Sequence, residues 1–541
     1  MKRTSALAAG LSILLGAAAA AAAPPIPSAV VSTTGGRVQG LVENGISAFK
    51  GIPYGAPPIG EARFLPPRPA EPWNDVLAAD DFGAPAMQLY QRPHSGEPLA
   101  MQLATVFPMR AEMKIDNEDA LFLNVWTPAA DDARRPVLVW LHGGGYAYGS
   151  GAWPMYDGAN LARKGDVVVV TLNHRLNVFG YLHLAEILGE EYAHSGNAGL
   201  LDLVLALHWV RDNIAAFGGD PGNVTIMGES GGGSKVSHLM ATPAAKGLFH
   251  KAIVQSGPGL TAVRAETATR TARAILAELG LDPADRKRVR ERLASLPAER
   301  LLDAVRAAQA KAGGEFGGLP LAPVVDGDML PRHPFEPDAP PQSADVPLLI
   351  GWNKDEMTIF NTTAPWFGTL TEADLTARVR ALVGERAEPL LAAYRKLYPD
   401  HSPTYLYNAI AGDNWALRGS VLLAERKAAQ RAAPVFMYYL TWETPVGEGV
   451  FKSPHTLEIP FVFANVDKAV ALTGDSKAAR RLEHAMASSW IAFARTGNPE
   501  NDAVPEWPRY DAERRATLVF GDEPHVVDDP KGAIRELLTA K

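Results

Sequence analysis

The segment 228–232 carries the residues best suited to chemistry in this 541-residue chain. It reads Gly-Glu-Ser-Gly-Gly, a G-x-S-x-G pattern, and it lies between an apolar run, residues 224–227, and a helix-compatible stretch, residues 234–240. A turn between a strand and a helix holds a serine hydroxyl exposed, and glycines two residues to either side relieve its crowding. The helix N-terminus favours a developing anion. The pattern therefore predicts that Ser230 is the nucleophile of an acyl transfer.

Acyl transfer also requires hydrogen-bond donors for the oxyanion that forms. Residues 142–146 read His-Gly-Gly-Gly-Tyr, directly after the apolar run 137–141. Consecutive glycines allow backbone N–H groups to converge on one point, as in the oxyanion loops that precede such a serine. We expect the amides of Gly144, Gly145 and Gly231 to be the donors. His142 lies upstream of the serine beside this loop, and we interpret it as structural.

The acid and the base are expected after the nucleophile, in the order Asp or Glu and then His. His455 lies in a loop bracketed by prolines after the apolar run 435–440, where a strand would deliver it to the carboxyl edge of a sheet. His484 falls within a helical pattern and is interpreted as a surface or packing residue. Both Asp355 and Glu356 follow the run 348–350, and position alone does not choose between them. The other histidines in this half of the chain are His333, His401 and His525.

Other glycine-rich and metal chemistries do not fit the sequence. Residues 228–233 have Walker-like spacing, but Ser-Lys follows instead of the Lys-Ser/Thr order that holds phosphate and magnesium. No G-x-G-x-x-G, H-E-x-x-H or His/Cys cluster occurs, so we expect neither a cofactor nor a metal. The chain has no cysteine, which excludes thiol catalysis.

The pattern of apolar residues predicts the elements that hold these groups. Short β-rich runs are typical of strands buried on both faces of a parallel sheet, and helical spacing appears between them. The runs are residues 137–141, 167–172, 224–227, 252–255, 348–350 and 435–440, and the helical patterns are 197–217 and 477–494. Residues 30–50 indicate antiparallel strands, whereas residues 84–118 lack periodicity and indicate a surface loop. The sequence therefore predicts an α/β protein with a mostly parallel sheet and helices on both faces.

Taken together, these segments resemble the type-B carboxylesterase family, which includes bacterial para-nitrobenzyl esterases and the cholinesterases. The matching segments are residues 51–60, 118–126, 143–146, 173–180, 217–226, 228–232, 255–257, 355–356 and 455–463, which span roughly residues 31 to 510. The resemblance implies an α/β-hydrolase fold and hydrolysis of small to medium apolar esters through an acyl-enzyme, without a cofactor. We expect one catalytic domain, residues 23–541, with helical insertions over the active site at about 265–312 and 370–430.

The resemblance also assigns roles within the site. It selects Glu356 over Asp355, supports His455 as the base, and implies supporting roles for Glu229 and Ser256. Many relatives have a cysteine at the position of Ala120, which forms a disulfide across the loop before it. This chain has no cysteine, so its loop 84–118 lacks that disulfide. Some relatives are adhesion proteins that lost the serine, but this chain retains every predicted catalytic part. A thioesterase, amidase or lactonase would use the same triad, and pocket shape decides among them.

Composition bounds the partners and the location of the protein. The net charge is −8 without a basic run, so nucleic acid is not an expected partner. Residues 1–22 have a positive start, an apolar stretch and small residues at the end, which predicts a signal peptide rather than a stable membrane anchor. We therefore expect an exported enzyme, periplasmic or secreted, whose partner is a small-molecule ester. The sequence does not specify the oligomeric state. Six aromatic residues are candidates to line an apolar pocket or the core: Trp352, Phe360, Trp366, Phe367, Tyr405 and Trp415.

Overall fold

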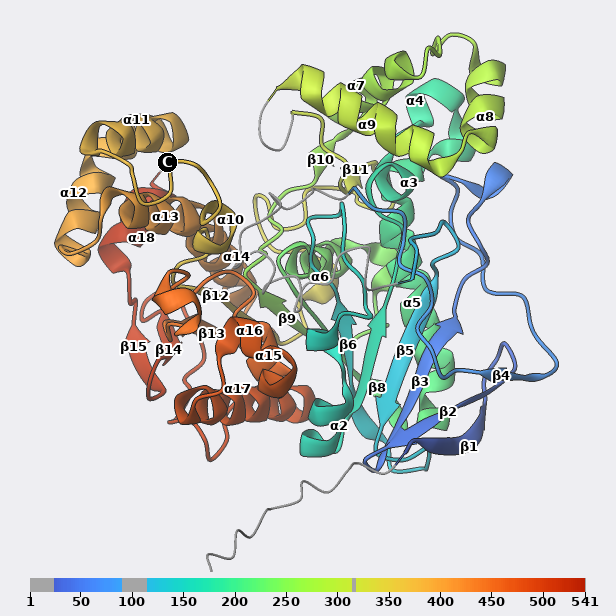
Figure 1. Cartoon of the computed structure of the whole chain (residues 1–541), viewed down its shortest axis with the longest axis horizontal. Coiled ribbons are helices and arrows are strands. Elements are labelled where there is room, and N and C mark those ends of the chain that lie inside the picture. The colour runs from blue at the N-terminus through green and yellow to red at the C-terminus, as the bar shows by residue number, and fades with distance from the viewer. Residues whose placement is uncertain (1–23, 90–113, 314–317, 541) are drawn as a thin grey trace, which may run out of the picture.

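The computed structural model describes residues 24–89, 114–313 and 318–540, and within them a thirteen-stranded sheet forms the centre of the protein (Figure 1). All neighbouring strands from β7 to β14 are parallel, and antiparallel strands flank them on both sides. Across the sheet the order is β1 (Ile26–Ser32), β2 (Arg37–Glu43), β3 (Ile46–Pro53), β5 (Phe122–Thr127), β7 (Val168–Leu172), β6 (Arg135–Leu141), β8 (Gly219–Glu229), β9 (Lys251–Gln255), β12 (Leu348–Asn353), β13 (Val435–Leu440), β14 (Ala516–Phe520) and β15 (His525–Asp528), with β4 (Val76–Ala78) paired to β2. The predicted mostly parallel sheet with helices around it is confirmed.

The six predicted apolar runs coincide with the six strands β6, β7, β8, β9, β12 and β13, although β8 is longer than its run. Strands β5 and β14 were not predicted from the sequence. In β5 the apolar pattern is interrupted by Asn124, which is buried because its side chain accepts a hydrogen bond from Gly51 N (2.9 Å) and donates one to Thr171 Oγ1 (2.9 Å). A buried polar residue with satisfied hydrogen bonds is invisible to a purely apolar pattern.

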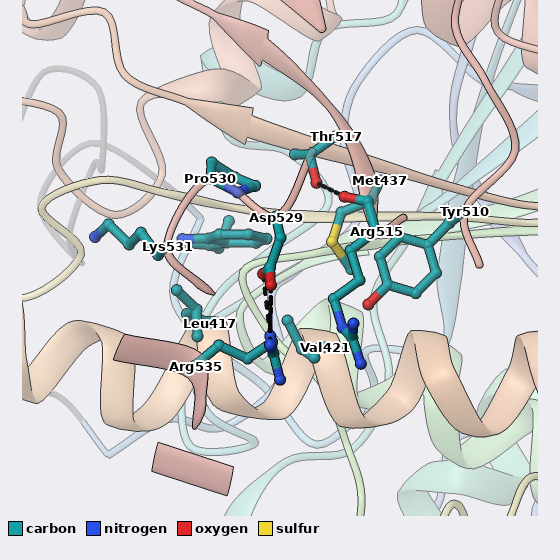
Figure 2. Close-up of a pocket in the computed structure, with 11 residues that line it drawn as sticks. Leu417, Val421, Met437, Tyr510, Arg515, Thr517, Asp529, Pro530, Lys531 and Arg535 are labelled. Carbon is teal, nitrogen blue, oxygen red and sulfur yellow. Dashed lines mark hydrogen bonds and ion pairs between the residues drawn. The ribbon is translucent and has the colours of Figure 1, made fainter. Parts of the chain in front are cut away.

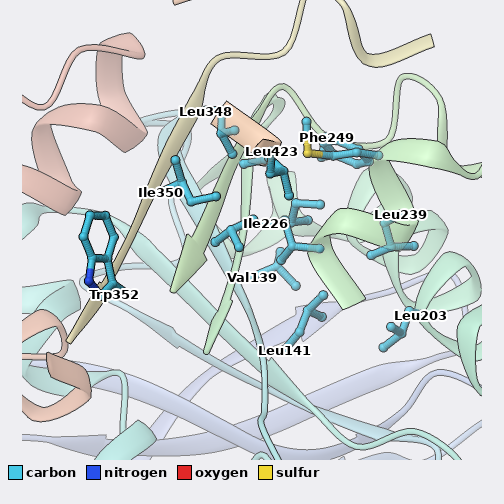
Figure 3. Close-up of a cluster of buried hydrophobic side chains, with 14 of the residues drawn as sticks. Val139, Leu141, Leu203, Ile226, Leu239, Phe249, Leu348, Ile350, Trp352 and Leu423 are labelled. Atoms are coloured by element: carbon cyan, nitrogen blue, oxygen red, sulfur yellow. The ribbon is translucent and has the colours of Figure 1, made fainter. Parts of the chain in front are cut away.

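Successive residues of a strand point to opposite sides of the sheet, so a strand that is apolar throughout needs cover on both faces. Helices provide this cover. In β6, Val139 and Leu141 belong to a core shared with α5 (Ala198–Asn213) and α6 (Gly231–Ala241), of which Figure 3 shows part. Leu138 and Trp140 belong to a second core shared with α2 (Ala159–Gly165) and α17 (Lys477–Thr496). Every residue of β6 is buried, as expected for a strand covered on both faces.

Both stretches predicted as helical insertions are helical, and they lie in separate groups (Figure 1). The first group is α7 (Ala265–Glu278), α8 (Arg286–Ser295) and α9 (Ala298–Ala312), beside α3 (Asn177–Tyr181) and α4 (Ala185–Leu188). The second group is α11 (Glu372–Val383), α12 (Ala387–Leu397), α13 (Pro403–Gly412) and α14 (Arg418–Ala429), beside α18 (Gly532–Thr539). The remaining helices are α10 (Thr358–Asn361), α15 (Glu458–Val462) and α16 (Val470–Thr473), and a separate pair of short strands is β10 (Val263–Arg264) and β11 (Val324–Val325).

Two predicted segments fall at least partly outside the described residues. The predicted signal peptide, residues 1–22, lies outside them entirely, as do residues 90–113 of the predicted loop 84–118. Within the described ranges, no helix combines the length and the apolar character needed to cross a bilayer.

Candidate active site

Ser230 occupies the single residue between the end of β8 and the start of α6. Its backbone has φ 58° and ψ −124°, a conformation that L-residues rarely adopt. The turn is held because Ser230 N donates to Gln255 O (2.9 Å) and Ser234 N donates to Ser230 O (3.0 Å). Ser230 is partly exposed, whereas Glu229 and Gly231 on either side are buried. Such backbone strain is typical of functional sites whose surroundings fix an unfavourable conformation.

The glycines of the G-x-S-x-G pattern are required by close backbone approaches. A Cβ atom on Gly228 would lie 2.6 Å from the carbonyl carbon of Gly232, and one on Gly232 would lie 2.0 Å from Leu141 O. A third glycine, Gly257 after β9, would place a Cβ 1.8 Å from Ser230 O. Larger residues at these positions would push the serine out of its turn.

The predicted oxyanion loop follows β6 and lies against the first turn of α6. Gly144, Gly145 and Tyr146 have φ values of 89°, 56° and 64°, so the loop makes an unbroken run of left-handed residues. A Cβ on Gly231 would lie 2.6 Å from Gly145 N, which places the two backbones in contact. The structure thus brings together the backbone of all three predicted donors, Gly144, Gly145 and Gly231.

His455 and Glu356 form a buried pair on neighbouring strand ends. His455 lies in the loop between β13 and α15, and its Nδ1 is 2.6 Å from Oε2 of Glu356, which follows β12. The other carboxylate oxygen of Glu356 accepts a hydrogen bond from Asn353 N (2.8 Å). Both side chains are at most 2% exposed. A carboxylate in this place fixes the tautomer and orientation of the imidazole and leaves Nε2 for proton transfer.

Asp355, the alternative acid, points elsewhere. Its Oδ2 accepts a hydrogen bond from Ser453 N (3.2 Å), and its own N–H donates to Ser453 O (2.8 Å). Burial raises the pKa of Asp355 to about 6. Asp355 therefore holds the loop that carries His455, two residues before the imidazole, and does not contact the ring.

A second carboxylate approaches the imidazole from the side of the nucleophile. Oε1 of Glu229, the residue before Ser230, lies 3.0 Å from Nε2 of His455. Burial opposes protonation of His455, but the carboxylates of Glu229 and Glu356 outweigh it and hold the pKa of the imidazole well above its usual range. Burial also disfavours the ionised form of Glu229 and raises the pKa of its carboxyl group, whereas His455 acts to lower that pKa. The two groups compete for one proton, so they titrate as a unit.

The described residues contain no hydrogen bond between Ser230 Oγ and His455. Nε2 of His455 instead faces the carboxylate of Glu229, the residue that directly precedes Ser230. In enzymes without bound substrate, catalytic hydrogen bonds are often long and tighten only in the substrate complex.

Two more residues lie behind this site. Glu458, three residues after His455, accepts hydrogen bonds from Asn353 Nδ2 (2.6 Å) and Gln255 Nε2 (3.2 Å), and burial raises its pKa to about 8. No role was predicted for Glu458 from the sequence, although it lies in the matching segment that begins with His455. Ser256, with a predicted supporting role, donates its N–H to Gly351 O (2.9 Å), but its buried hydroxyl has no hydrogen-bond partner among the described residues.

Two aromatic side chains flank the imidazole. The ring centroids of Phe360 and Trp415 lie 5.2 and 5.1 Å from that of His455. Both residues are unusually exposed for their size, at 46% and 37%. Of the other aromatic candidates, Trp352 belongs to the core and stacks on Tyr439 (4.9 Å). Phe360 and Trp415 therefore offer apolar surface next to the reacting groups.

A π-helical segment, Asp413–Leu417, positions Trp415 between α13 and α14. Its first residue is fixed by a buried ion pair to Lys531 (2.6 Å) and by a hydrogen bond from the Tyr394 hydroxyl (2.5 Å). Its last residue borders a cavity of about 10 Å³, shown in Figure 2, which has room for no more than one water molecule. These contacts hold the segment that carries Trp415 in place.

The other histidines considered from the sequence form no hydrogen bond or ion pair with Ser230 or Glu356 within the described residues. His142 is buried and stacks on His174 with ring centroids 5.0 Å apart, which agrees with a structural role. The others contact local groups: His333 accepts from Ala262 N, His401 stacks on Tyr398, His484 contacts Lys164 Nζ, and His525 lies exposed on β15. In the ranges that the structure describes, no three His, Cys, Asp or Glu side chains are grouped to hold a metal ion.

Known proteins match this chain over nearly its whole length, and solved structures among them have a similar fold. The model of the carboxylesterase family matches residues 27–534. The chain is 38% identical to a para-nitrobenzyl esterase of Bacillus subtilis, over 94% of this chain and 98% of that protein. It is 34% identical to a phenmedipham hydrolase of Pseudarthrobacter oxydans, over 92% and 96% of the two chains. Among solved structures, a carboxylesterase of Geobacillus stearothermophilus superposes with a TM-score of 0.81 at 41% identity, over 94% of this chain and 99% of that one.

Proposed function

This chain belongs to the carboxylesterase family, and from that membership we propose that it hydrolyses carboxylic esters through a triad of Ser230, His455 and Glu356. The observation that carries the triad is the 2.6 Å contact between His455 Nδ1 and Glu356, with Nε2 directed at the end of β8 that bears Ser230. That arrangement leaves the imidazole oriented for a proton from the serine. The overall activity, serine-dependent cleavage of carboxylic esters, follows from the family.

In the proposed acylation step, Ser230 Oγ attacks the ester carbonyl while His455 Nε2 takes the hydroxyl proton. The carbonyl oxygen becomes an oxyanion, which accepts hydrogen bonds from the amides of Gly144, Gly145 and Gly231. The ionised Glu356 stabilises the imidazolium that forms. Collapse of the intermediate breaks the bond to the alcohol, which leaves with the proton from His455. Water, deprotonated by the same imidazole, then releases the acid and restores Ser230.

Replacement of Glu356 by Gln should lower kcat about 10³- to 10⁴-fold, because an amide cannot stabilise the imidazolium or hold its tautomer. Replacement of Asp355 by Asn is the matched control, since its carboxylate binds the backbone of Ser453 and not the ring. We expect Asp355→Asn to lower the thermal midpoint with less than a tenfold loss of kcat. Both variants are measured on one ester, and a larger kcat loss in Asp355→Asn would contradict the assignment of the acid.

We propose apolar esters with an aromatic alcohol or acyl group as the preferred substrates. Support comes from Phe360 and Trp415, which present exposed rings within about 5 Å of the imidazole. The name of the Bacillus subtilis relative, para-nitrobenzyl esterase, supports the inclusion of benzyl esters in a panel of substrates. The panel also contains a thioester, an anilide and a lactone, and faster turnover of one of these would replace the ester assignment.

Replacement of Trp415 by Ala should lower kcat/KM for a benzyl ester about tenfold relative to the matching methyl ester. The reason is the lost contact with the aromatic group, since an aromatic pair contributes about 0.5–1.5 kcal/mol. Trp366→Ala is the control, because Trp366 packs on Tyr407 and does not contact His455. Equal losses on the two esters in Trp415→Ala would show that this ring supports the imidazole instead of binding substrate.

We also propose that the enzyme is exported to the periplasm or the medium. The support is the pattern of residues 1–22 described above. Fractionation of cells that produce the full chain, followed by N-terminal sequencing of the active fraction, tests this proposal.

A further inference from the structure

Lys235 is a buried lysine that the proposed mechanism does not use. It lies in the second turn of α6, five residues after Ser230, and its side chain is fully buried. Its Nζ donates a hydrogen bond to His142 O (2.7 Å), the only acceptor it has within the described residues. No carboxylate within these residues forms an ion pair with it, and burial lowers its pKa to about 7. A buried ammonium group costs free energy unless hydrogen bonds or an opposite charge compensate its lost hydration, and here one acceptor compensates it only in part.

The contacts of Lys235 fall on both ends of the oxyanion loop. His142 O belongs to the first peptide of the loop, and the ring of Tyr146 at the far end lies 5.3 Å from Nζ. The preceding residue, Ser234, accepts a hydrogen bond from the Tyr146 hydroxyl (2.7 Å). Two consecutive residues of α6 therefore hold the loop at both ends, while the helix N-terminus supplies the amide of Gly231.

The loop needs such support because its conformation is strained. Gly144, Gly145 and Tyr146 are all left-handed, and Tyr146 lacks the conformational freedom of glycine. Amide donors contribute most when they already point to the place where the oxyanion will form. A shift of the first peptide would turn the amides of Gly144 and Gly145 away from that place.

We propose that Lys235 is a positioning residue of the oxyanion hole, which fixes the His142 peptide and places a positive charge behind the loop. This inference rests on the proposed function, because it assigns the loop to the oxyanion. The titratable groups that face Lys235 are His142, His174 and Tyr146. Burial, followed by the charge of Lys235, lowers the pKa of both histidines, so these rings remain neutral. Lys235 is thus the group of this cluster that carries a positive charge when protonated, and with a pKa of about 7 it takes up a proton readily where an oxyanion forms nearby.

The first test compares Lys235→Met with Lys427→Met. Lys427 is an equally buried lysine of α14 that donates to a backbone carbonyl, Ala344 O (2.7 Å), outside the site. Lys427 also donates to Gln430 Oε1 (3.1 Å). We expect both variants to lose thermal stability, because each leaves a backbone carbonyl without its donor. Only Lys235→Met should lower kcat, about 10- to 100-fold with KM changed less than about twofold, because an oxyanion contact is made in the transition state.

A trifluoromethyl ketone separates the oxyanion contact from general binding. Ser230 adds to its carbonyl, the hydroxyl proton passes to His455, and the ketone oxygen becomes an oxyanion. Lys235→Met should weaken this inhibitor by the same factor as kcat, while binding of the matching unfluorinated ketone stays unchanged. Equal weakening of both ketones, or an unchanged kcat in the folded variant, would overturn the proposal.

A measurement on the wild-type enzyme covers the case in which the variant does not fold. Lysine labelled with ¹³C at Cε reports the protonation of Lys235 by NMR, with and without the trifluoromethyl ketone. An oxyanion stabilised by Lys235 must raise the pKa of Lys235 in return, whereas the signal of Lys427 should not move. Absence of a shift at Lys235 would overturn the proposal. If wild-type protein and Ser230→Ala hydrolyse esters equally, the proposed function itself fails, which is a separate result.

Discussion

Replacement of Ser230 by Ala should leave a folded protein whose ester hydrolysis is lowered about 10⁴- to 10⁶-fold. The loss is large because the hydroxyl is the group that forms the acyl-enzyme, and the rest of the site cannot replace it. The fold should survive because Ser230 Oγ makes no hydrogen bond within the described residues and is not fully buried. Steady-state rates on a benzyl ester, together with thermal unfolding, give both quantities.

Ser230→Gly provides a control that separates chemistry from strain. At φ 58° and ψ −124° a Cβ atom is unfavourable, so its removal should stabilise the folded protein by about 1 kcal/mol while activity stays as low as in the alanine variant. A serine-directed organophosphate should label the wild-type enzyme once and neither variant. Activity above a few per cent of wild type in both variants would place the nucleophile elsewhere.

Most of the central sheet was predictable because six of its parallel strands, β6, β7, β8, β9, β12 and β13, are buried on both faces and give short apolar runs, whereas the parallel strand β14 was not predicted. The failures have physical causes in particular residues. Asn124 breaks the run of β5, since its side chain replaces apolar contacts by hydrogen bonds to Gly51 and Thr171. The π-helical segment Asp413–Leu417 depends on an ion pair to Lys531, 118 residues away, which no local pattern contains.

The candidate site divides in the same way. The turn of Ser230 and the glycine loop were predictable because they depend on local backbone geometry that only certain residues allow. The choice of Glu356 over Asp355 required the family resemblance, because both follow the same strand and only tertiary contacts separate them. In the sequence, Lys235 served only as evidence against a Walker motif. Its partners, His142 and Tyr146, lie in the loop after β6, and only the fold brings that loop to Lys235.

The pH dependence of kcat/KM is the second large effect that we expect. Burial of His455 and a single ionised carboxylate, that of Glu356, act in opposite directions and would by themselves change its pKa little. The structure brings a second carboxylate, Glu229, to 3.0 Å from Nε2. Burial disfavours the imidazolium, but the two carboxylates together hold the pKa of His455 well above its usual range of about 6.5.

The sign of the effect follows from the form of His455 that acts as a base. Only the neutral imidazole accepts the proton of Ser230, so a raised pKa moves the acidic limb of kcat/KM above about pH 6.5, with a plateau at higher pH. Glu229→Gln should move this limb to lower pH, because it removes a carboxylate that favours the imidazolium while it keeps the shape of the side chain.

His455→Ala should abolish the limb with nearly all activity, whereas His484→Ala, on the surface of α17, should preserve both. Rate profiles from pH 5 to 9 on one ester measure all four proteins. A limb that does not move in Glu229→Gln would show that Glu229 is protonated in the free enzyme, and a wild-type profile in His455→Ala would refute the base.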